Sequence, residues 1–265
     1  MKAEIAVENL REVKDVLDKN DVEFWLDSGA LLGAVRDGKK IEWDTDIDLG
    51  TWYTNVTQLT SIFPEFKKKG FSAFLDMKWG AMSILRGGVD NAVNVSLYRE
   101  ESDCAWTIWI VREKRVAKVL YRCVSVSNTR VYAKDPLKNK YFLSVLPLTL
   151  KQLITNTAWS QLNRLGCMVL VVVPKHFFEK LECLRFYGME FNVPSDVEDY
   201  LAYRYGDWRM PARHWVYHRD DGAICSRRGE MLHTSIYDFS QKINYEKIKF
   251  VKRKRQQLFN VQVNF

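Results

Sequence analysis

No cysteine pair in this 265-residue sequence has the C-x-x-C spacing of a zinc site or a redox motif. The chain has an odd number of cysteines, and they lie far apart, at Cys104, Cys123, Cys167, Cys183 and Cys225. This usage provides neither a disulfide framework nor a zinc framework. We therefore expect a reducing compartment, although one or two bridges could form in a lumenal protein of this size.

Long apolar runs are also lacking. No stretch approaches the ~18 residues of a membrane span, and the start, MKAEIAVENLREVKDVLDKN, has no apolar core of signal-peptide length. We therefore expect a soluble, cytoplasmic chain. The Golgi or the secretory lumen is the alternative if the N-terminus is incomplete.

No Gly/Ser-rich or Pro-rich linker divides the chain, and no internal repeat is present. With 47% hydrophobic and 13% aromatic residues, the chain can bury a large core. We expect a single domain over residues 1–265 of the α+β (mixed α/β) class, with a mixed sheet, flanking helices and a helix-rich C-terminal half.

The net charge of +7 is concentrated at one end of the chain. Residues 241–265 contain seven Lys or Arg and one Glu, so the rest of the chain is nearly neutral. Such a run is most often a solvated tail or helix face, and contact with an anionic membrane surface is the alternative. Nucleic acid is not a partner that we expect.

Hydrophobic spacing predicts the main elements. Ala6, Leu10, Val13 and Leu17 predict an amphipathic helix over residues 3–19. A strand (VEFWLD), a turn into a short helix (SGALLGAVRDG) and a second strand (DIDLG) follow, and the runs between residues 71 and 126 predict antiparallel sheet.

Two further helices are predicted in the C-terminal half. After the apolar run CMVLVVV, Pro174 suits a helix start and Gly188 a helix end. Ser195 and Glu198 have capping-box spacing, which predicts a helix over about residues 196–205.

The stretch IEWDTDIDLG, residues 41–50, concentrates negative charge in an apolar setting. In a strand, Asp44, Asp46 and Asp48 would point to one face, about 6.6 Å apart. At an effective dielectric constant near 20, each adjacent pair would then cost roughly 2.5 kcal/mol. The cluster therefore needs a cation or water nearby.

The residues before the cluster indicate which group would bind beside such a cation. Ser28 and Gly29 follow a predicted strand, where backbone N–H groups and a hydroxyl can hold a phosphate. Asp46 and Asp48 offer the carboxylate oxygens that a hard divalent cation prefers, Mg²⁺ above all. A phosphate cradle beside a metal indicates a nucleotide, and metal-assisted phosphoryl transfer is the chemistry that this pairing suits.

The string LDSGALLGAVRDGKKIEWDTDIDLG resembles the LicD-like proteins, which include bacterial phosphocholine transferases and the fukutin and fukutin-related proteins that add ribitol phosphate to glycans. The motif residues here are Gly29, Leu31, Leu32, Gly33, Arg36, Trp43, Asp44, Asp46 and Asp48. FYGMEFNVPSDVEDYLAYRYGDW resembles the closing motif of that family, whereas residues 51–180 resemble it only weakly.

The resemblance implies a nucleotidyltransferase fold in which Asp46 and Asp48 bind Mg²⁺ or Mn²⁺. Ser28, Gly29 and Gly33 belong to the turn that it assigns to nucleotide phosphate, and Asp44 is either a partner of the metal site or a polar cap. Family members usually carry a further acid on a later strand, where this chain has Asn94. Either Asp90 or Asp76 then supplies the missing charge, or activity is reduced.

Two roles are possible for each of the other motif residues. Arg36 either pairs with a donor phosphate or fixes the acid cluster through a bidentate contact. Trp43 and Trp25 stack on a base or belong to the core, with the core favoured. Residues 205–208 close the acceptor side, or Gly206 only ends a helix.

The resemblance implies a metal-dependent transferase that moves a phospho-alditol or phosphocholine group from a CDP-linked donor to a glycan hydroxyl and releases CMP. A glycosyltransferase using a nucleotide-sugar is one alternative, because it also uses an Asp-x-Asp pair. A weakly active or inactive relative that binds a nucleotide or a glycan is another, and Asn94 is its best support.

Overall fold

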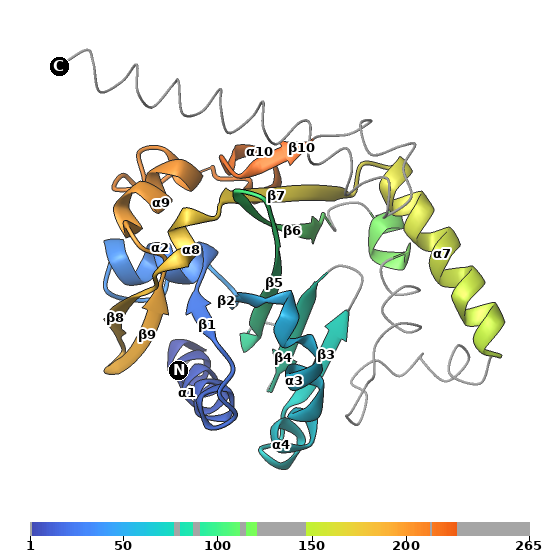
Figure 1. Cartoon of the computed structure of the whole chain (residues 1–265), viewed down its shortest axis with the longest axis horizontal. Helices are drawn as coiled ribbons and strands as arrows, with labels where there is room; N and C mark the ends of the chain where they lie inside the picture. The colour runs from blue at the N-terminus through green and yellow to red at the C-terminus, as the bar shows by residue number, and fades with distance from the viewer. Residues whose placement is uncertain are drawn as a thin grey trace.

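The computed structural model describes residues 2–76, 80–86, 91–111, 115–120, 147–212 and 214–226. Within them, ten strands form one mixed sheet that is flanked by helices (Figure 1). The main strand order is β10-β7-β6-β5-β2-β1-β9-β8, and β3 and β4 branch from β5. The predicted mixed α/β class is confirmed.

Three strands form the centre of the sheet: β1 (Phe24–Leu26), β2 (Ile47–Trp52) and β5 (Val93–Glu101). β1 is antiparallel to β2, and β2 is parallel to β5. Helix α2 (Ser28–Arg36) connects β1 to the segment before β2, so the predicted order of strand, turn, helix and strand is confirmed. The parallel pairing places Asp48 beside Asn94 on the neighbouring strand.

The predicted antiparallel region follows. β3 (Ser72–Asp76), β4 (Ala81–Leu85), β5 and β6 (Cys104–Ile110) pair in succession, each antiparallel to the next. The first part of β5 pairs with β2 and β4, whereas its last residues, 99–101, pair with β6. The last predicted run, YRCVSVS, lies outside the described residues, as do Asp90 and the basic segment 241–265.

The helix predicted between Pro174 and Gly188 is wrong. Pro174 ends β7 (Met168–Pro174), and α8 (His176–Glu179) is only a short helix. β8 (Glu182–Phe186) and β9 (Met189–Val193) then form a hairpin. Tyr187 and Gly188 have φ values of 50° and 75°, so Gly188 permits a hairpin turn rather than ending a helix.

The last predicted helix is confirmed as α9 (Val197–Tyr205), which Gly206 ends at a φ of 68°. The capping box is wrong, because no side chain caps α9. The Ser195 hydroxyl donates instead to the carbonyl groups of His176 and Phe177, both at 3.3 Å. These bonds tie the start of α9 to α8. The described part of the chain ends with α10 (Tyr217–Asp220) and β10 (Ile224–Ser226).

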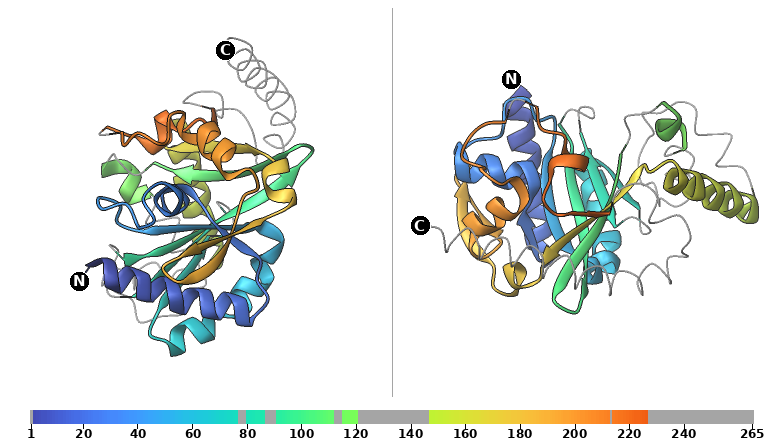
Figure 2. Two further views of the ribbon diagram at one scale, coloured as in Figure 1. Left: turned by 90° about the vertical axis from the view of Figure 1, so that its left-hand side faces the viewer. Right: turned by 90° about the horizontal axis from the view of Figure 1, so that it is seen from above.

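Helix α1 (Lys2–Lys19) buries the predicted stripe of Ala6, Leu10, Val13 and Leu17 against the main core. It contacts β5 and α4 (Phe63–Lys68), which follows η1 (Tyr53–Asn55) and α3 (Val56–Ser61). Helix α7 (Leu148–Arg164) packs on a second core over β6 and β7. Figures 1 and 2 both place α7 on the side of the molecule opposite α9.

A membrane-spanning helix is not found in the part of the chain that the structure describes, since no helix there combines the necessary length and hydropathy.

Gly50 provides a test of the central packing. A Cβ atom at this position would lie 2.2 Å from Nε1 of the fully buried Trp25. We expect Gly50→Ala to lower the free energy of unfolding by about 1–3 kcal/mol, measured by denaturant titration. Trp25→Phe frees space at this contact, so Gly50→Ala should cost less in that background. Equal costs in both backgrounds would contradict this packing.

Candidate active site

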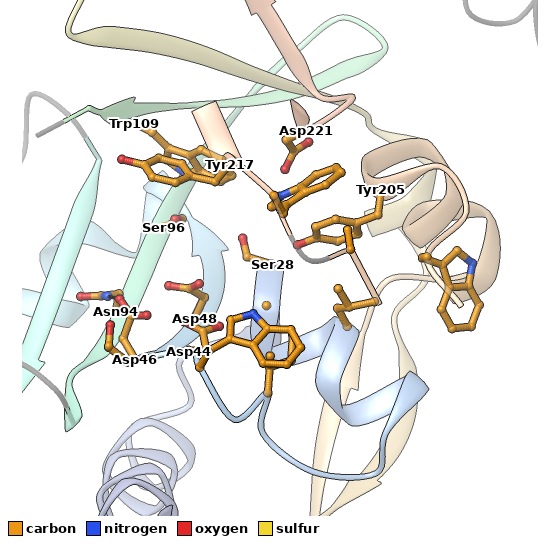
Figure 3. A pocket seen from close by; sticks show the side chains of 18 of the residues that line it. Ser28, Asp44, Asp46, Asp48, Asn94, Ser96, Trp109, Tyr205, Tyr217 and Asp221 are labelled. Atoms are coloured by element: carbon orange, nitrogen blue, oxygen red, sulfur yellow. Dashed lines mark hydrogen bonds between the residues drawn. The ribbon is translucent and has the colours of Figure 1, made fainter. Parts of the chain in front are cut away.

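One pocket of about 540 Å³ brings together most of the residues singled out in the sequence (Figure 3). Its lining includes Ser28, Gly29, Arg36, Asp44, Asp46, Asp48 and Asn94. Gly33 is not among the lining residues. A Cβ atom there would lie 2.6 Å from the Lys39 carbonyl oxygen, so Gly33 permits close packing of the segment after α2.

The three aspartates do not share one strand. β2 begins at Ile47, so only Asp48 lies in the strand, and the regular strand spacing expected for Asp44 and Asp46 is wrong. The carboxylates gather in the pocket because the segment before β2 folds back over α2. A Cβ atom on Gly29 would lie 2.3 Å from Oδ2 of Asp44. Glycine at position 29 therefore lets this carboxylate approach the start of α2.

This cluster carries negative charge that the protein balances poorly. Burial and then the neighbouring Asp46 carboxylate raise the pKa of Asp44 to about 6, which Lys40 partly opposes. Burial, followed by repulsion from Asp46 and Asp44, raises the pKa of Asp48 well above its usual range. The pocket therefore attracts cations.

Arg36 does not supply that cation. Its guanidinium donates to both carboxylate oxygens of Asp37, at 2.9 and 2.7 Å. These hydrogen bonds raise the pKa of Arg36 and lower that of Asp37. The expected bidentate contact with the acid cluster is therefore wrong. Arg36 still lines the pocket.

Asn94 lies beside the acid cluster, at the strand position where the family resemblance implies a third acid. Its Nδ2 donates to Oδ2 of Asp46 at 2.5 Å, and its Oδ1 accepts from the Ser83 hydroxyl at 2.8 Å. The side chain thus offers a donor to Asp46 rather than a third negative charge. Asp76 ends β3, which β4 separates from β5.

The oxygen donors of the pocket bear on whether Mg²⁺ or Mn²⁺ fits there. Among the described residues, no group of three or more His, Cys, Asp or Glu side chains is arranged to hold a metal ion. Asp46 and Asp48 nevertheless provide two hard oxygen donors in a pocket of unbalanced negative charge. Mg²⁺ commonly takes one or two protein carboxylates and completes its shell with water and substrate phosphate. The pair therefore fits such an ion.

Ser28 and Gly29 form the opposite side of this end of the pocket. Asp27 caps α2 by accepting the Ser28 N–H at 2.8 Å, so that amide is not available to a ligand, contrary to the expectation for a phosphate cradle. The Ser28 hydroxyl and the next amides of the first helical turn remain suitable for an anion.

Aromatic side chains form the other wall. Trp109 and Tyr217 pack edge to face with 5.8 Å between ring centroids, and the rings of Tyr205 and Trp215 lie 5.2 Å apart. Figure 3 shows Trp109 and Tyr217 across the cavity from Asp48. Tyr205, Asp207 and Trp208 also line the pocket, in addition to the role of Gly206 in ending α9.

The two tryptophans of the motif region differ in their exposure to solvent. Trp25 is fully buried in the core, so its expected alternative role in stacking on a base is wrong. Trp43 is 67% exposed and lines the pocket, so the preference for a core position is wrong for this residue.

A buried ionic network behind the pocket was missed in the sequence. Arg204 of α9 donates from Nη1 to Asp27 at 2.9 Å and from Nη2 to Asp221 at 2.6 Å. The hydroxyl groups of Tyr98 and Tyr200 each donate to Asp27 at 2.7 Å. The available signal was a charged residue, Arg204, within YLAYRY, an otherwise aromatic and apolar helix segment.

Comparison with known proteins gives a family for part of the chain. Residues 21–117 match the family described as LicD/FKTN/FKRP, nucleotidyltransferase domain. This range contains the aspartates, α2 and the position of Asn94. The LicD-like, fukutin-related resemblance found in the sequence is therefore confirmed.

Individual relatives match over shorter stretches. An uncharacterized protein of Rickettsia typhi is 28% identical over 94 residues, which cover 36% of this chain and 28% of that protein. The mouse and human proteins named ribitol 5-phosphate transferase FKRP are each 47% identical over 49 residues. Those residues cover 18% of this chain and 10% of FKRP, so the match spans a small part of these relatives.

Two solved structures also show some similarity, at low sequence identity. The lincosamide adenylyltransferase LnuA is 10% identical with a TM-score of 0.35, and covers 73% of this chain and 83% of its own. The antibiotic-resistance factor ANT(2'')-Ia is 13% identical with a TM-score of 0.32, and covers 60% of this chain and 94% of its own.

Asp48→Asn tests the electrostatic description of the cluster. The variant replaces one half-buried acid, which its acidic neighbours repel, at nearly constant shape, so without metal it should be about 1 kcal/mol more stable. Its melting temperature should rise by about 2–4 °C. Added Mg²⁺ should raise the melting temperature of the parent but not that of the variant.

The control is Asp18→Asn, at an exposed position on α1 that pairs with Lys14. It should change the melting temperature little and preserve the response to Mg²⁺. A metal-free Asp48→Asn protein that melts below the parent would contradict the description.

Proposed function

We propose that the chain is a metal-dependent transferase, because residues 21–117 match the LicD/FKTN/FKRP nucleotidyltransferase domain family. It moves a phospho-alditol or phosphocholine group from a CDP-linked donor to a glycan hydroxyl and releases CMP. The family suggests a phosphotransferase type of activity on glycans. The observation that carries the finer proposal is the cluster of Asp46 and Asp48, which faces Ser28 and Gly29 across one pocket.

Asp46 and Asp48 would hold Mg²⁺ or Mn²⁺. When bound, such an ion neutralises phosphate charge and polarises the phosphorus that is attacked. The Ser28 hydroxyl and the start of α2 supply hydrogen-bond donors and a positive dipole end to the remaining phosphate oxygens. Arg36, at the pocket wall, supplies a further positive group.

The reaction is a displacement at the phosphorus that carries the transferred group. The acceptor hydroxyl oxygen forms the new phosphorus–oxygen bond, and its proton passes to solvent. The bond to CMP breaks, and CMP leaves with the electron pair. The role of the protein is to align the two oxygens and to stabilise the transferring phosphoryl group.

The aromatic wall supports a ring-bearing substrate on the far side of the pocket. Trp109, Tyr205 and Tyr217 present large apolar faces near a dense set of carboxylates. Such faces suit the sugar or base portions of the donor and acceptor, whereas the acid cluster suits the metal-bound diphosphate.

A glycosyltransferase would use the same pair of aspartates for a nucleotide-sugar. The products separate the two reactions, because sugar transfer from a UDP-sugar releases UDP, whereas transfer of a phospho-group releases CMP.

A nucleotide-binding relative with little activity is favoured by one observation. Asn94 stands beside Asp48 and donates its amide to Asp46, so the described cluster has an amide where a third acid would add charge. Metal-dependent nucleotide binding without turnover would favour this second candidate.

Phosphorus NMR tests the proposal directly. The protein is incubated with Mg²⁺, a panel of short glycans, and CDP-ribitol, CDP-glycerol, CDP-choline or UDP-sugars. We expect CMP from one CDP donor, and a rate at least about 100-fold lower for Asp46→Asn and Asp48→Asn. Asp18→Asn is the matched surface control and should retain the parent rate. Unchanged rates in the folded pocket variants would refute the proposal.

Asn94→Asp tests the position beside Asp48. A third carboxylate should raise the affinity for Mn²⁺ by about tenfold, because the affinity of such sites rises with ligand charge. Electron paramagnetic resonance titration of free Mn²⁺ measures this affinity without turnover. An affinity equal to or below that of the parent would show that Asn94 does not limit metal binding.

A further inference from the structure

Arg204 is a cation in the protein interior that is paired with two carboxylates. Its side chain is fully buried, and so are its two carboxylate partners, Asp27 and Asp221. Asp221 accepts from both Nε and Nη2 of Arg204, and it also accepts the Ala223 N–H at 2.8 Å. These bonds fix the guanidinium plane between the start of α2 and the segment after α10. Such a plane aims each of its N–H groups in a set direction.

One of those N–H groups reaches the pocket wall. Nη2 of Arg204 donates to Oγ of Ser28 at 3.3 Å, whereas Nη1 donates to Asp27, the cap of α2. Arg204 itself is not among the residues that line the pocket, but Ser28 and Asp221 are. Arg204 therefore acts on the cavity only through its neighbours.

Ser28 has a backbone conformation that requires support. Its φ is +48°, in the left-handed region that serine rarely adopts. Asp27 accepts the Ser28 N–H, and Arg204 donates to the Ser28 hydroxyl oxygen. The backbone N–H and the hydroxyl group of Ser28 are therefore both fixed by hydrogen bonds. With its oxygen accepting from Arg204, the Ser28 hydroxyl can direct its own proton toward a ligand. A strained residue held in this way at a pocket wall points to function.

The same guanidinium supports the aromatic wall. Its central carbon lies 5.2 Å from the centroid of Trp109 and 5.7 Å from that of Tyr205. Arg204 thus contacts the phosphate side of the pocket through Ser28 and the aromatic side through two rings. Both Arg204 and Asp221 lie beyond residue 117, where the family match ends.

We propose that Arg204 is a positioning residue that orients the Ser28 hydroxyl toward a phosphate of the bound nucleotide, with Asp27 and Asp221 holding Arg204 in place. The functional site then extends beyond the matched domain to α9 and Asp221. This inference rests on the proposed function, because it requires a nucleotide phosphate at Ser28.

A double-mutant cycle on binding tests the inference without turnover. The full chain, Ser28→Ala, Arg204→Lys and the double variant are titrated by calorimetry with Mg²⁺ and either CDP or UDP, whichever the parent binds. A lysine at position 204 keeps the charge but loses the planar fork. Thermal melting of each protein shows that it is folded.

We expect Ser28→Ala and Arg204→Lys each to weaken nucleotide binding by about tenfold, the usual effect of one lost hydrogen bond to a charged group. The double variant should be no weaker than either single variant, because both changes remove the same contact. Arg209→Lys is the matched control, since Arg209 forms an exposed ion pair with Glu198 just after α9. This control should bind as the parent does.

Multiplied effects in the double variant, or parent-like binding by Arg204→Lys, would overturn the inference and leave the proposed function intact. A parent chain that binds neither nucleotide would overturn both. If Arg204→Lys does not fold, Asp221→Asn replaces it in the cycle, because this change loosens one anchor of Arg204 and keeps the guanidinium. The same non-additivity with Ser28→Ala is expected, and additive effects would contradict the inference.

Discussion

The buried ion network of Asp27, Arg204 and Asp221 is the interaction on which the pocket depends. It joins three distant parts of the chain: the end of β1, the last turn of α9 and the segment after α10. Removing Arg204 would leave two uncompensated buried carboxylates, at a cost of about 3–5 kcal/mol. The relative placement of the two pocket walls is therefore coupled to an interaction that tolerates little change.

The second constraint is a cluster of carboxylates whose negative charge the surrounding side chains neutralise only in part. Asp44, Asp46 and Asp48 lie together although repulsion and burial raise the pKa values of Asp44 and Asp48. The neighbouring Arg36 is bonded to Asp37. The fold thus pairs two buried acids, Asp27 and Asp221, with an arginine and leaves the acid cluster facing a cavity. A divalent cation with a phosphate ligand would complete the charge balance.

Local patterns in the sequence predicted the elements that position the site. The apolar stripe of α1, the order of β1, α2 and β2, and the helix α9 follow from periodicity that tertiary contacts reinforce. The hairpin of β8 and β9 was mistaken for a helix, because Gly188 serves a hairpin turn as readily as a helix end. The loop that gathers Asp44 and Asp46 was mistaken for strand, because its aspartates alternate with the period of a strand although β2 begins only at Ile47. The pairing of Arg204 with Asp27 spans 177 residues, and no local pattern in a single sequence specifies such a contact.

The most direct measurement of the central claim is a crystal structure with Mn²⁺ and CDP, in which anomalous scattering locates the manganese. We expect manganese at Asp46 and Asp48, the diphosphate beside Ser28 and Gly29, and Arg204 still bonded to Asp27 and Asp221. A diphosphate bound elsewhere, or no manganese at the two aspartates, would contradict the proposed site.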